Sequence, residues 1–230
     1  MKNLFLIISK KFILIFLCVI VCIAAAITIF AVKATSSPKP QYTIVIDAGH
    51  GGVDGGAVGR KTGITESEIN LTYAKTLKEI CENLGMSVVL TRKDMNGLYS
   101  PLATNRKRSD MEKRRDIIKN SNADIVISIH MNAFASSSSR GSQVFYGLGN
   151  AQGKILAASI QNAFRIEDEF AKALPKEGDF YILNCVSIPG ALVEYGFLSN
   201  AEDEKLLINE DYRQKMCQAT ASGILNFLDM

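Results

Sequence analysis

The sequence predicts a single α/β domain: a mostly parallel, twisted sheet between two layers of helices, preceded by an N-terminal membrane-spanning helix. Three observations lead to this prediction. Apolar, strand-like runs alternate with amphipathic helical runs from residue 42 onward. The 230 residues suffice for one domain of ordinary size, and a composition of 47% hydrophobic and 21% charged residues is typical of globular proteins. This composition excludes collagen-like, disordered and disulfide-framework proteins.

An apolar run of 21 residues, 12–32, contains no charge, Gly or Pro. As a helix it would span roughly 30 Å, the thickness of the hydrocarbon layer of a bilayer. Lys2, Lys10 and Lys11 precede it, which predicts a cytoplasmic segment at 1–11 and export of everything after the run. Residues 33–41 have the composition of an exposed linker. We expect an uncleaved single-pass anchor, and a cleaved secretory signal is the alternative.

The charge of the exported part excludes a nucleic-acid-binding surface. Residues 1–40 hold five of the 26 basic side chains and no acidic one, so 21 basic residues stand against 23 acidic ones in the remainder.

The exported cysteines, Cys81, Cys185 and Cys217, have no C-x-x-C spacing, and we expect Cys81 and Cys217 to be buried as small apolar residues.

The first half of the domain contains three predicted strands, at 43–47, 87–91 and 124–130. A glycine-rich loop follows the first strand. Thr65 and Glu68 then form a capping box that starts a helix ending at Gly85. Its apolar residues have helical spacing and are expected to face the core: Ile69, Tyr73, Leu77, Ile80 and Leu84. A charged helix is predicted at 110–121.

The second half begins with a flexible serine-rich loop at 136–139 and a short strand at 143–146. A helix is predicted at 154–164 and a last strand at 191–194. A closing helix at 212–228 is expected to turn Met216, Ala219 and Leu225 inward. No internal repeat is present, and the remaining length leaves no room for a second domain.

The chain has two histidines, His50 and His130, and each follows or closes a predicted strand. Ligands of open α/β sheets bind at the carboxyl ends of strands, which favours a site over two hydrogen-bonded core residues. A catalytic zinc needs three protein ligands, so the third must be a carboxylate. Glu66 is the candidate, because Glu68 serves the capping box; interaction of Glu66 with the helix dipole is the alternative.

Glu194 closes an otherwise apolar predicted strand, in the segment PGALVEYGF. Desolvation there should raise the pKa of its carboxyl toward the range of a general base. A buried ion pair with an arginine is the alternative.

Together these residues resemble the zinc-dependent N-acetylmuramoyl-L-alanine amidases of the type-3 cell-wall group. The matching blocks occur in order over residues 42–228: IDAGHGGVDGGAVG, TESEINL, LTR, KR with ADIVISIHMNA, and PGALVEYGFLSN. The resemblance implies that His50, Glu66 and His130 bind one Zn²⁺ and that Glu194 is the catalytic glutamate. The implied substrate is peptidoglycan, cut at the amide between N-acetylmuramic acid and L-Ala.

Four other polar residues are candidates for supporting or substrate-binding roles. We expect Asp54 to fix the loop that carries His50. Arg92 and Arg114 would steady the site, bind the anionic stem peptide or form ordinary ion pairs. Asn132 would bind substrate or cap the loop after His130.

The chain departs from the family pattern at two places. Met131 stands where many relatives carry alanine, and residues 165–181 lack the usual Arg-Gly substrate loop. No helical insertion that would occlude the site is evident, so we expect an open groove.

An anchored catalytic domain without wall-binding repeats resembles the sporulation amidases, which prepare spore-cortex peptidoglycan for muramic-δ-lactam formation and germination. We therefore expect an extracytoplasmic, membrane-held enzyme in the forespore or cortex space, with the need for an accessory protein left open. A zinc peptidase cutting within the stem peptide, or an inactive membrane-anchored wall-binding protein, are the alternatives.

Overall fold

The computed structural model describes residues 15–23 and 41–228. The chain divides into two units, one up to Lys39 and one from Pro40 onward, and each is described by itself. In the first unit, residues 15–23 form a helix. No helix among the described residues is long and apolar enough to cross a membrane. The predicted 12–32 anchor, its 1–11 flank and the 33–41 linker fall largely outside the described residues.

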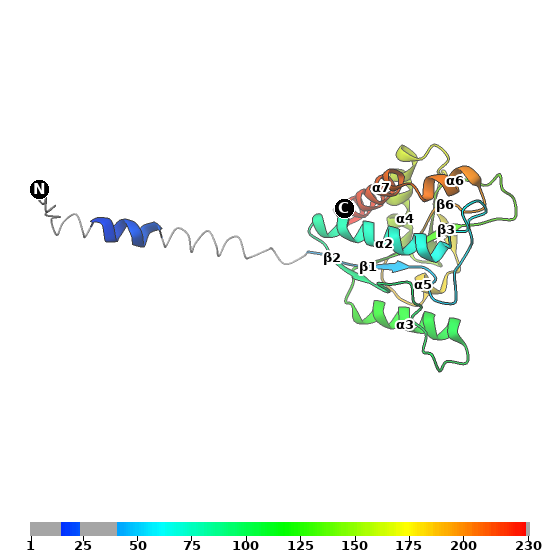
Figure 1. Cartoon of the computed structure of the whole chain (residues 1–230), viewed down its shortest axis with the longest axis horizontal. Helices are drawn as coiled ribbons and strands as arrows, with labels where there is room; N and C mark the ends of the chain where they lie inside the picture. The colour runs from blue at the N-terminus through cyan, green and yellow to red at the C-terminus, as the bar shows by residue number, and fades with distance from the viewer. Residues whose placement is uncertain (1–14, 24–40, 229–230) are drawn as a thin grey trace, which may run out of the picture. The chain divides into compact units, whose positions relative to one another are not determined.

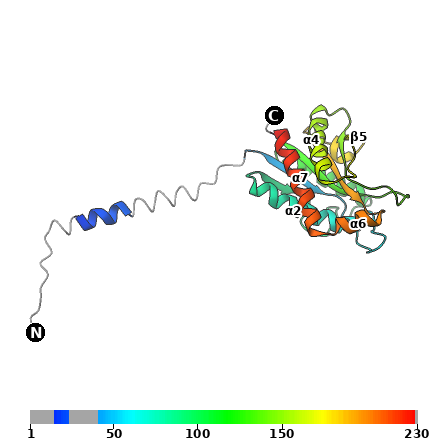
Figure 2. The same ribbon diagram turned by 90° about the horizontal axis from the view of Figure 1, so that it is seen from above.

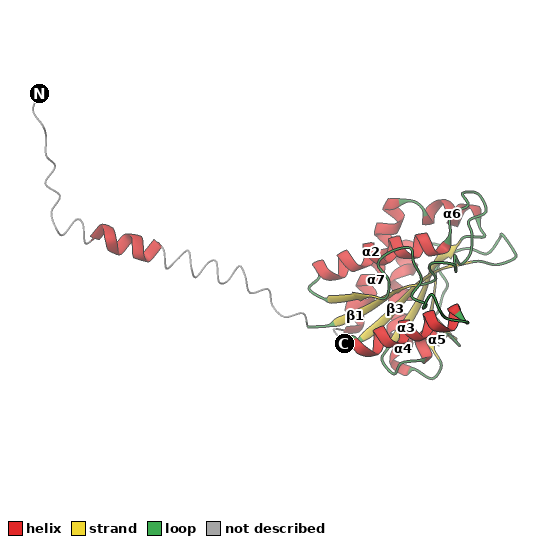
Figure 3. Cartoon of the chain, turned by 60° about the horizontal axis from the view of Figure 1, so that its bottom comes forward, coloured by secondary structure: helices red, strands yellow, loops and turns green. Residues whose placement is uncertain are grey.

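The second unit is built on a six-stranded sheet in the order β2-β1-β3-β6-β4-β5. Four strands run parallel: β1 (Thr43–Ala48), β2 (Ser87–Leu90), β3 (Ile125–Asn132) and β6 (Gly190–Phe197). β4 (Gln143–Gly147) is antiparallel to β6, and β5 (Lys176–Gly178) is parallel to β4. The predicted mostly parallel sheet is confirmed, and Figure 3 shows it between helices.

Helices cover both faces of this sheet (Figure 1). One face carries α2 (Glu66–Asn83), α4 (Ala151–Glu167) and α7 (Glu210–Leu228), and Figure 2 shows α7 alongside α2 and α4. The other face carries α3 (Arg106–Asn120) and α5 (Tyr181–Asn184). The short helix α6 (Ala201–Leu207) follows β6 and packs against β6 and α7. The three-layer prediction is therefore confirmed.

Side chains of the strands alternate between two apolar clusters. On β1, Ile44 and Ile46 belong to the larger cluster, beneath α2 and α7, while Val45 belongs to the smaller one, with Ile118 of α3 and Leu183 of α5. A strand buried on both faces requires apolar side chains at every position, which is why the central strands appear as continuous apolar runs in the sequence.

Several predicted boundaries differ from the structure. Helix α3 begins at Arg106 rather than near residue 110, because the side chain of Asn105 caps it by accepting a hydrogen bond from the backbone N–H of Arg108. Leu84 was expected to be buried but is 47% exposed, because it is the C-cap residue just past α2. The elements β5, α5 and α6 were not predicted, since each is too short to give a periodic pattern.

Two further expectations concern residues near the core. Cys81 and Cys217 are fully buried, as predicted. Strands β3 and β6 continue past His130 and Glu194, which lie within the strands rather than at their last residue.

Candidate metal centre

The loop after β1 brings His50 to the edge of the sheet. His50 has φ 61°, a left-handed conformation that is uncommon for a residue other than Gly. The preceding residue, Gly49, donates its backbone N–H to the carbonyl of Ile129 on β3 at 3.0 Å. A Cβ at position 49 would lie 2.3 Å from Nε2 of His130, so only glycine lets the two histidine segments approach this closely.

Glu66 is the first residue of α2 and is 5% exposed. Its Oε1 lies 2.8 Å from Nδ1 of His130 and 3.2 Å from Nε2 of His50. Its Oε2 accepts a hydrogen bond of 2.9 Å from the backbone N–H of Ala57. The neighbouring Glu68 accepts the N–H of Thr65 at 2.9 Å, as the capping box predicts, so Glu66 is left to face the histidines.

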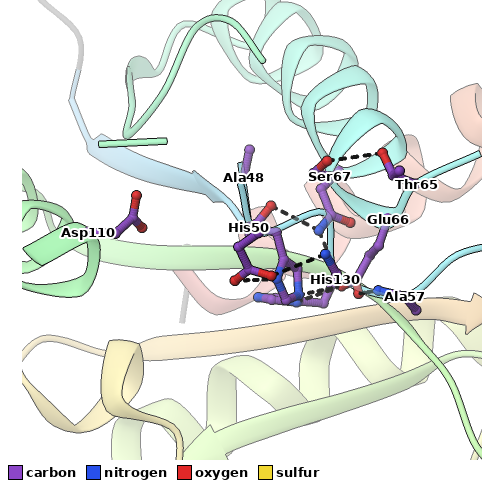
Figure 4. Close-up of polar contacts among 12 residues, drawn as sticks. Ala48, His50, Ala57, Thr65, Glu66, Ser67, Asp110 and His130 are labelled. Carbon is purple, nitrogen blue, oxygen red and sulfur yellow. Dashed lines mark hydrogen bonds and ion pairs between the residues drawn. The ribbon is translucent and has the colours of Figure 1, made fainter. Parts of the chain in front are cut away.

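The three side chains form a group that could hold a metal ion. One donor atom from each of His50, Glu66 and His130 lies within 4.8 Å of the others, and Figure 4 shows the three side chains pointing toward one another. Two imidazole nitrogens and one carboxylate oxygen are a donor set that catalytic zinc sites use, and a tetrahedral ion so bound keeps one position open.

The charge states suit this role. Burial raises the pKa of Glu66, but its contacts with His130 and His50 more than offset burial and hold the pKa well below its usual range. Burial lowers the pKa of His50, whereas Glu66 and Asp54 raise it, with a net increase. The carboxylate is therefore ionised at neutral pH, as a metal ligand must be.

Glu194 lies across from this group on β6. Its backbone is the register partner of His130 on β3, and its side chain lines the same cavity as both histidines. Its Oε2 is buried without a hydrogen-bond partner in the described part of the chain, and no arginine pairs with it there. Burial, followed by the negative charge of Glu66, raises the pKa of Glu194 well above its usual value.

Two polar side chains support the group. Asp54 places its Oδ2 3.0 Å from Nδ1 of His50 and accepts the N–H of Gly56 at 3.2 Å, so it fixes the loop as expected. Asn70, fully buried on α2, donates to Glu66 Oε1 at 3.3 Å and to the carbonyl of Gly49 at 3.1 Å. Sequence reasoning missed Asn70; its place four residues after Glu66, on the same helix face, is the available signal.

Arg92 and Arg114 are committed to the fold. Arg92, 2% exposed, donates to four backbone carbonyls, those of Ala48, Gly49, Ser67 and Asp94. Arg114, 1% exposed, pairs with Asp47 and Asp110 at 2.6 Å each and donates to the carbonyls of Ala48 and His50. Both steady the His50 loop, which was one of the alternatives. Binding of the stem peptide by either residue stays a prediction, since these contacts use four of the five N–H groups of each guanidinium.

Asn132 ends β3, beyond a register shift that separates it from His130. Its carbonyl accepts the N–H of Leu198 at 2.8 Å, and it is not among the residues that line the cavity. A contact between Asn132 and substrate therefore gains no support from this geometry.

The cavity at the metal group has a volume of about 460 Å³. The loop after β1 and strands β3 and β6 form one wall, and α3 and the start of α5 form the other. A ligand in the cavity would lie next to His50, His130 and Glu194 together. This arrangement suits a reaction in which a metal ion and a proton acceptor act on the same group of the substrate.

Comparisons with known proteins agree with this arrangement. Residues 44–226 match the family Amidase_3, described as N-acetylmuramoyl-L-alanine amidase. The germination-specific N-acetylmuramoyl-L-alanine amidase of Bacillus subtilis (strain 168) is 36% identical over 201 residues, which cover 85% of this chain and 83% of that protein.

Solved structures agree as well. The CwlD amidase from Clostridioides difficile, in complex with the GerS lipoprotein, has a TM-score of 0.79 and 38% identity, covering 82% of this chain and 99% of that one. The catalytic domain of CwlV from Bacillus (Paenibacillus) polymyxa var. colistinus has a TM-score of 0.72 and 31% identity, with 82% and 99% covered. The chain therefore belongs to the N-acetylmuramoyl-L-alanine amidase family Amidase_3.

Proposed function

We propose that this amidase uses one Zn²⁺, held by His50, Glu66 and His130, and that Glu194 moves the proton during hydrolysis of the amide between N-acetylmuramic acid and L-Ala in peptidoglycan. The observation that carries the proposal is the buried, unpartnered Oε2 of Glu194 in the cavity that His50 and His130, two of the three donors, also line. When bound, zinc lowers the pKa of a water to about 7 and polarises a carbonyl.

The environment of Glu194 suits proton transfer in both directions. Its raised pKa lets the carboxylate accept a proton from the attacking water and then give that proton to the amide nitrogen as the C–N bond breaks. The water oxygen remains on the lactyl carbonyl carbon as a new carboxylate, and the stem peptide leaves with a free amino group on L-Ala. One carboxylate is sufficient for both transfers.

The test is mass analysis of the products that the full-length, zinc-loaded chain releases from peptidoglycan. We expect free stem peptides that begin with L-Ala. Products in which L-Ala remains on muramic acid would instead indicate a peptidase, and an absence of products would indicate a wall-binding protein without activity.

A variant separates the role of Glu194 from that of the metal group. Glu194→Gln should lower turnover about 10²–10⁴-fold with unchanged zinc content, because a neutral amide cannot accept the proton. Glu169→Gln, at an exposed position outside the cavity, is the matched control and should keep full activity. Equal turnover of Glu194→Gln and the control would contradict the assignment.

We also propose that residues 12–32 anchor the chain, with the catalytic unit on the extracytoplasmic side, and that the substrate is spore-cortex peptidoglycan. The apolar run with its preceding lysines supports the anchor, and the germination-specific relative in Bacillus subtilis supports the substrate. The mass of the chain recovered from membranes distinguishes an intact N-terminus from cleavage near Lys33. The substrate is tested by deleting the gene for this chain: the cortex peptidoglycan of the resulting spores should lack muramic-δ-lactam.

A further inference from the structure

The cavity extends beyond the reaction centre to the first turn of α3. There it is lined by Arg106 and Lys107 of α3, by Tyr99 before that helix and by Tyr181 at the start of α5. Tyr99 accepts the N–H of Val53, in the loop that carries His50, at 3.3 Å, and the other three make no hydrogen bond to the metal group or Glu194 within the described residues. The cavity therefore offers a second region, continuous with the first, that a substrate longer than one amide would occupy.

Two positive charges in this region are uncommitted. Arg106 and Lys107 are exposed, and neither has an ion-pair or hydrogen-bond partner within the described residues. Arg106 contacts an aromatic face, its guanidinium lying 5.5 Å from the centre of the Tyr99 ring. By contrast, the adjacent Arg108 is paired with Glu112 at 2.9 Å.

Within the described residues, no acidic side chain that lines the cavity forms an ion pair with Arg106 or Lys107. Asp47 and Asp110 are paired with Arg114. Asp179 accepts a hydrogen bond of 2.9 Å from the side chain of Asn184. Asp54 lies against His50. Among the residues of α3 that line the cavity, Arg106, Lys107 and Arg114 are basic and only Asp110 is acidic, so this wall carries a net positive charge.

The position of Lys107 links this wall to the reaction centre. Lys107 lines the same cavity as His50 and Glu194. An anionic group of a substrate held at Glu194 would therefore lie within reach of the charge of Lys107.

The stability of α3 does not account for these cations. The N-terminal turn of a helix is the positive end of its dipole, so basic side chains there are unfavourable. The first turn of α3 contains Arg106, Lys107 and Arg108 and no acidic residue. A role outside the helix itself explains their placement better than folding does.

We propose that Arg106 and Lys107 form a subsite for the carboxylates of the stem peptide, with the peptide side of the scissile amide directed toward α3. This inference rests on the proposed amidase reaction, in which the leaving group is an anionic peptide. Two exposed cations at the mouth of a cavity orient such a group and raise its local concentration. They contribute to substrate binding rather than to the chemical step.

The test compares two soluble muramoyl peptides, one with free stem carboxylates and one with every stem carboxylate amidated. For Arg106→Gln/Lys107→Gln we expect KM for the free-carboxylate substrate to rise roughly 3- to 30-fold, the effect of losing two exposed ion pairs. The kcat should change little, and the amidated substrate should not distinguish the variant from the wild type. Added salt should weaken binding of the charged substrate to the wild type more than to the variant.

Lys113→Gln/Lys119→Gln is the matched control, because it removes the same charge from exposed positions of the same helix outside the cavity. It should keep wild-type KM for both substrates. Thermal unfolding followed by circular dichroism should show that Arg106→Gln/Lys107→Gln is no less stable than the wild type.

Binding is also measured in the Glu194→Gln background, where turnover does not interfere. Weaker binding of the free-carboxylate peptide alone supports the subsite, even if the wild type proves to have a different cleavage point. Unchanged binding, or an equal loss for both peptides or in the control, would overturn the subsite while leaving the amidase proposal intact.

Discussion

Arg114→Met would remove the guanidinium that joins Asp47, on β1, to the backbone of the metal-binding loop. Arg114 contacts Asp47 Oδ1 at 2.6 Å, the carbonyl of Ala48 at 2.8 Å and the carbonyl of His50 at 2.6 Å. Met has a similar length and keeps most of the packing of the aliphatic stem. The substitution therefore isolates the loss of charge and hydrogen bonds.

The expected loss of stability is large, because Asp47 is 2% exposed and would be left without its counter-ion. Removing one partner of a buried ion pair costs about 3–5 kcal/mol. For a domain of this size that corresponds to a decrease in Tm of about 6–20 °C. The hydroxyls of Thr91 and Ser128 still donate to Asp47, which favours the lower part of that range.

The dependence of this loss on pH has a definite sign. In the wild type, burial raises the pKa of Asp47, while Arg114, Ser128 and Thr91 lower it to a net value below its usual one. The stabilisation from this depressed pKa is present at neutral pH and is lost as the pH falls through the folded-state pKa. Without Arg114, burial dominates and raises the pKa of Asp47. The stability deficit of the variant should therefore shrink as the pH falls and Asp47 becomes protonated.

The assay is thermal unfolding of metal-free protein followed by circular dichroism, for Arg114→Met, Asp47→Asn/Arg114→Met and wild type. The double variant removes the orphaned charge and should recover at least about 1 kcal/mol. Zinc affinity of the single variant should fall about 10- to 100-fold, because the His50 carbonyl loses its donor. A single variant as stable as the wild type, or a double variant less stable than the single, would refute the reasoning.

Three further outcomes are expected. Gly49→Ala should lower zinc affinity at least about 100-fold without unfolding the chain, because the new methyl group would occupy the place of the His130 ring; competition with a chelator measures this. Asn70→Ala should weaken zinc binding about 10- to 100-fold, because Glu66 and the carbonyl of Gly49 lose the donor that they share. Thr72→Ala, on the exposed face of α2, is the control and should bind zinc as the wild type does. Zinc affinity should decrease from about pH 8 to about pH 6, because His50 must be neutral to bind metal and its pKa is raised. Burial lowers that pKa, but the contacts of His50 with Glu66 and Asp54 raise it by more. A zinc affinity independent of pH would contradict this prediction.

Much of the site was predictable because few residues could fill it. The sequence contains two histidines, and both follow apolar runs that end at the same edge of a parallel sheet. The capping box accounts for Glu68 and leaves Glu66 as the free carboxylate. The structure brings these donors within 4.8 Å of one another.

The supporting contacts were not predictable from sequence alone. Arg114 has two acidic partners, one four residues earlier on its helix and one on a distant strand, and only the folded chain shows that it also donates to the backbone of the His50 loop. The role of Asn70 depends on the carbonyl of Gly49 in a separate loop. Sequence separation carries no information about such distances.

The sequence by itself determined the layers of the domain and the residue types able to bind a metal, because periodicity and composition follow from which faces are buried. The tertiary structure decided the neighbours. It placed β6 beside β3, so that Glu194 faces His130, and it turned the first turn of α3 toward the same cavity. Strand order and helix placement depend on packing between segments far apart in the chain, which no local pattern encodes.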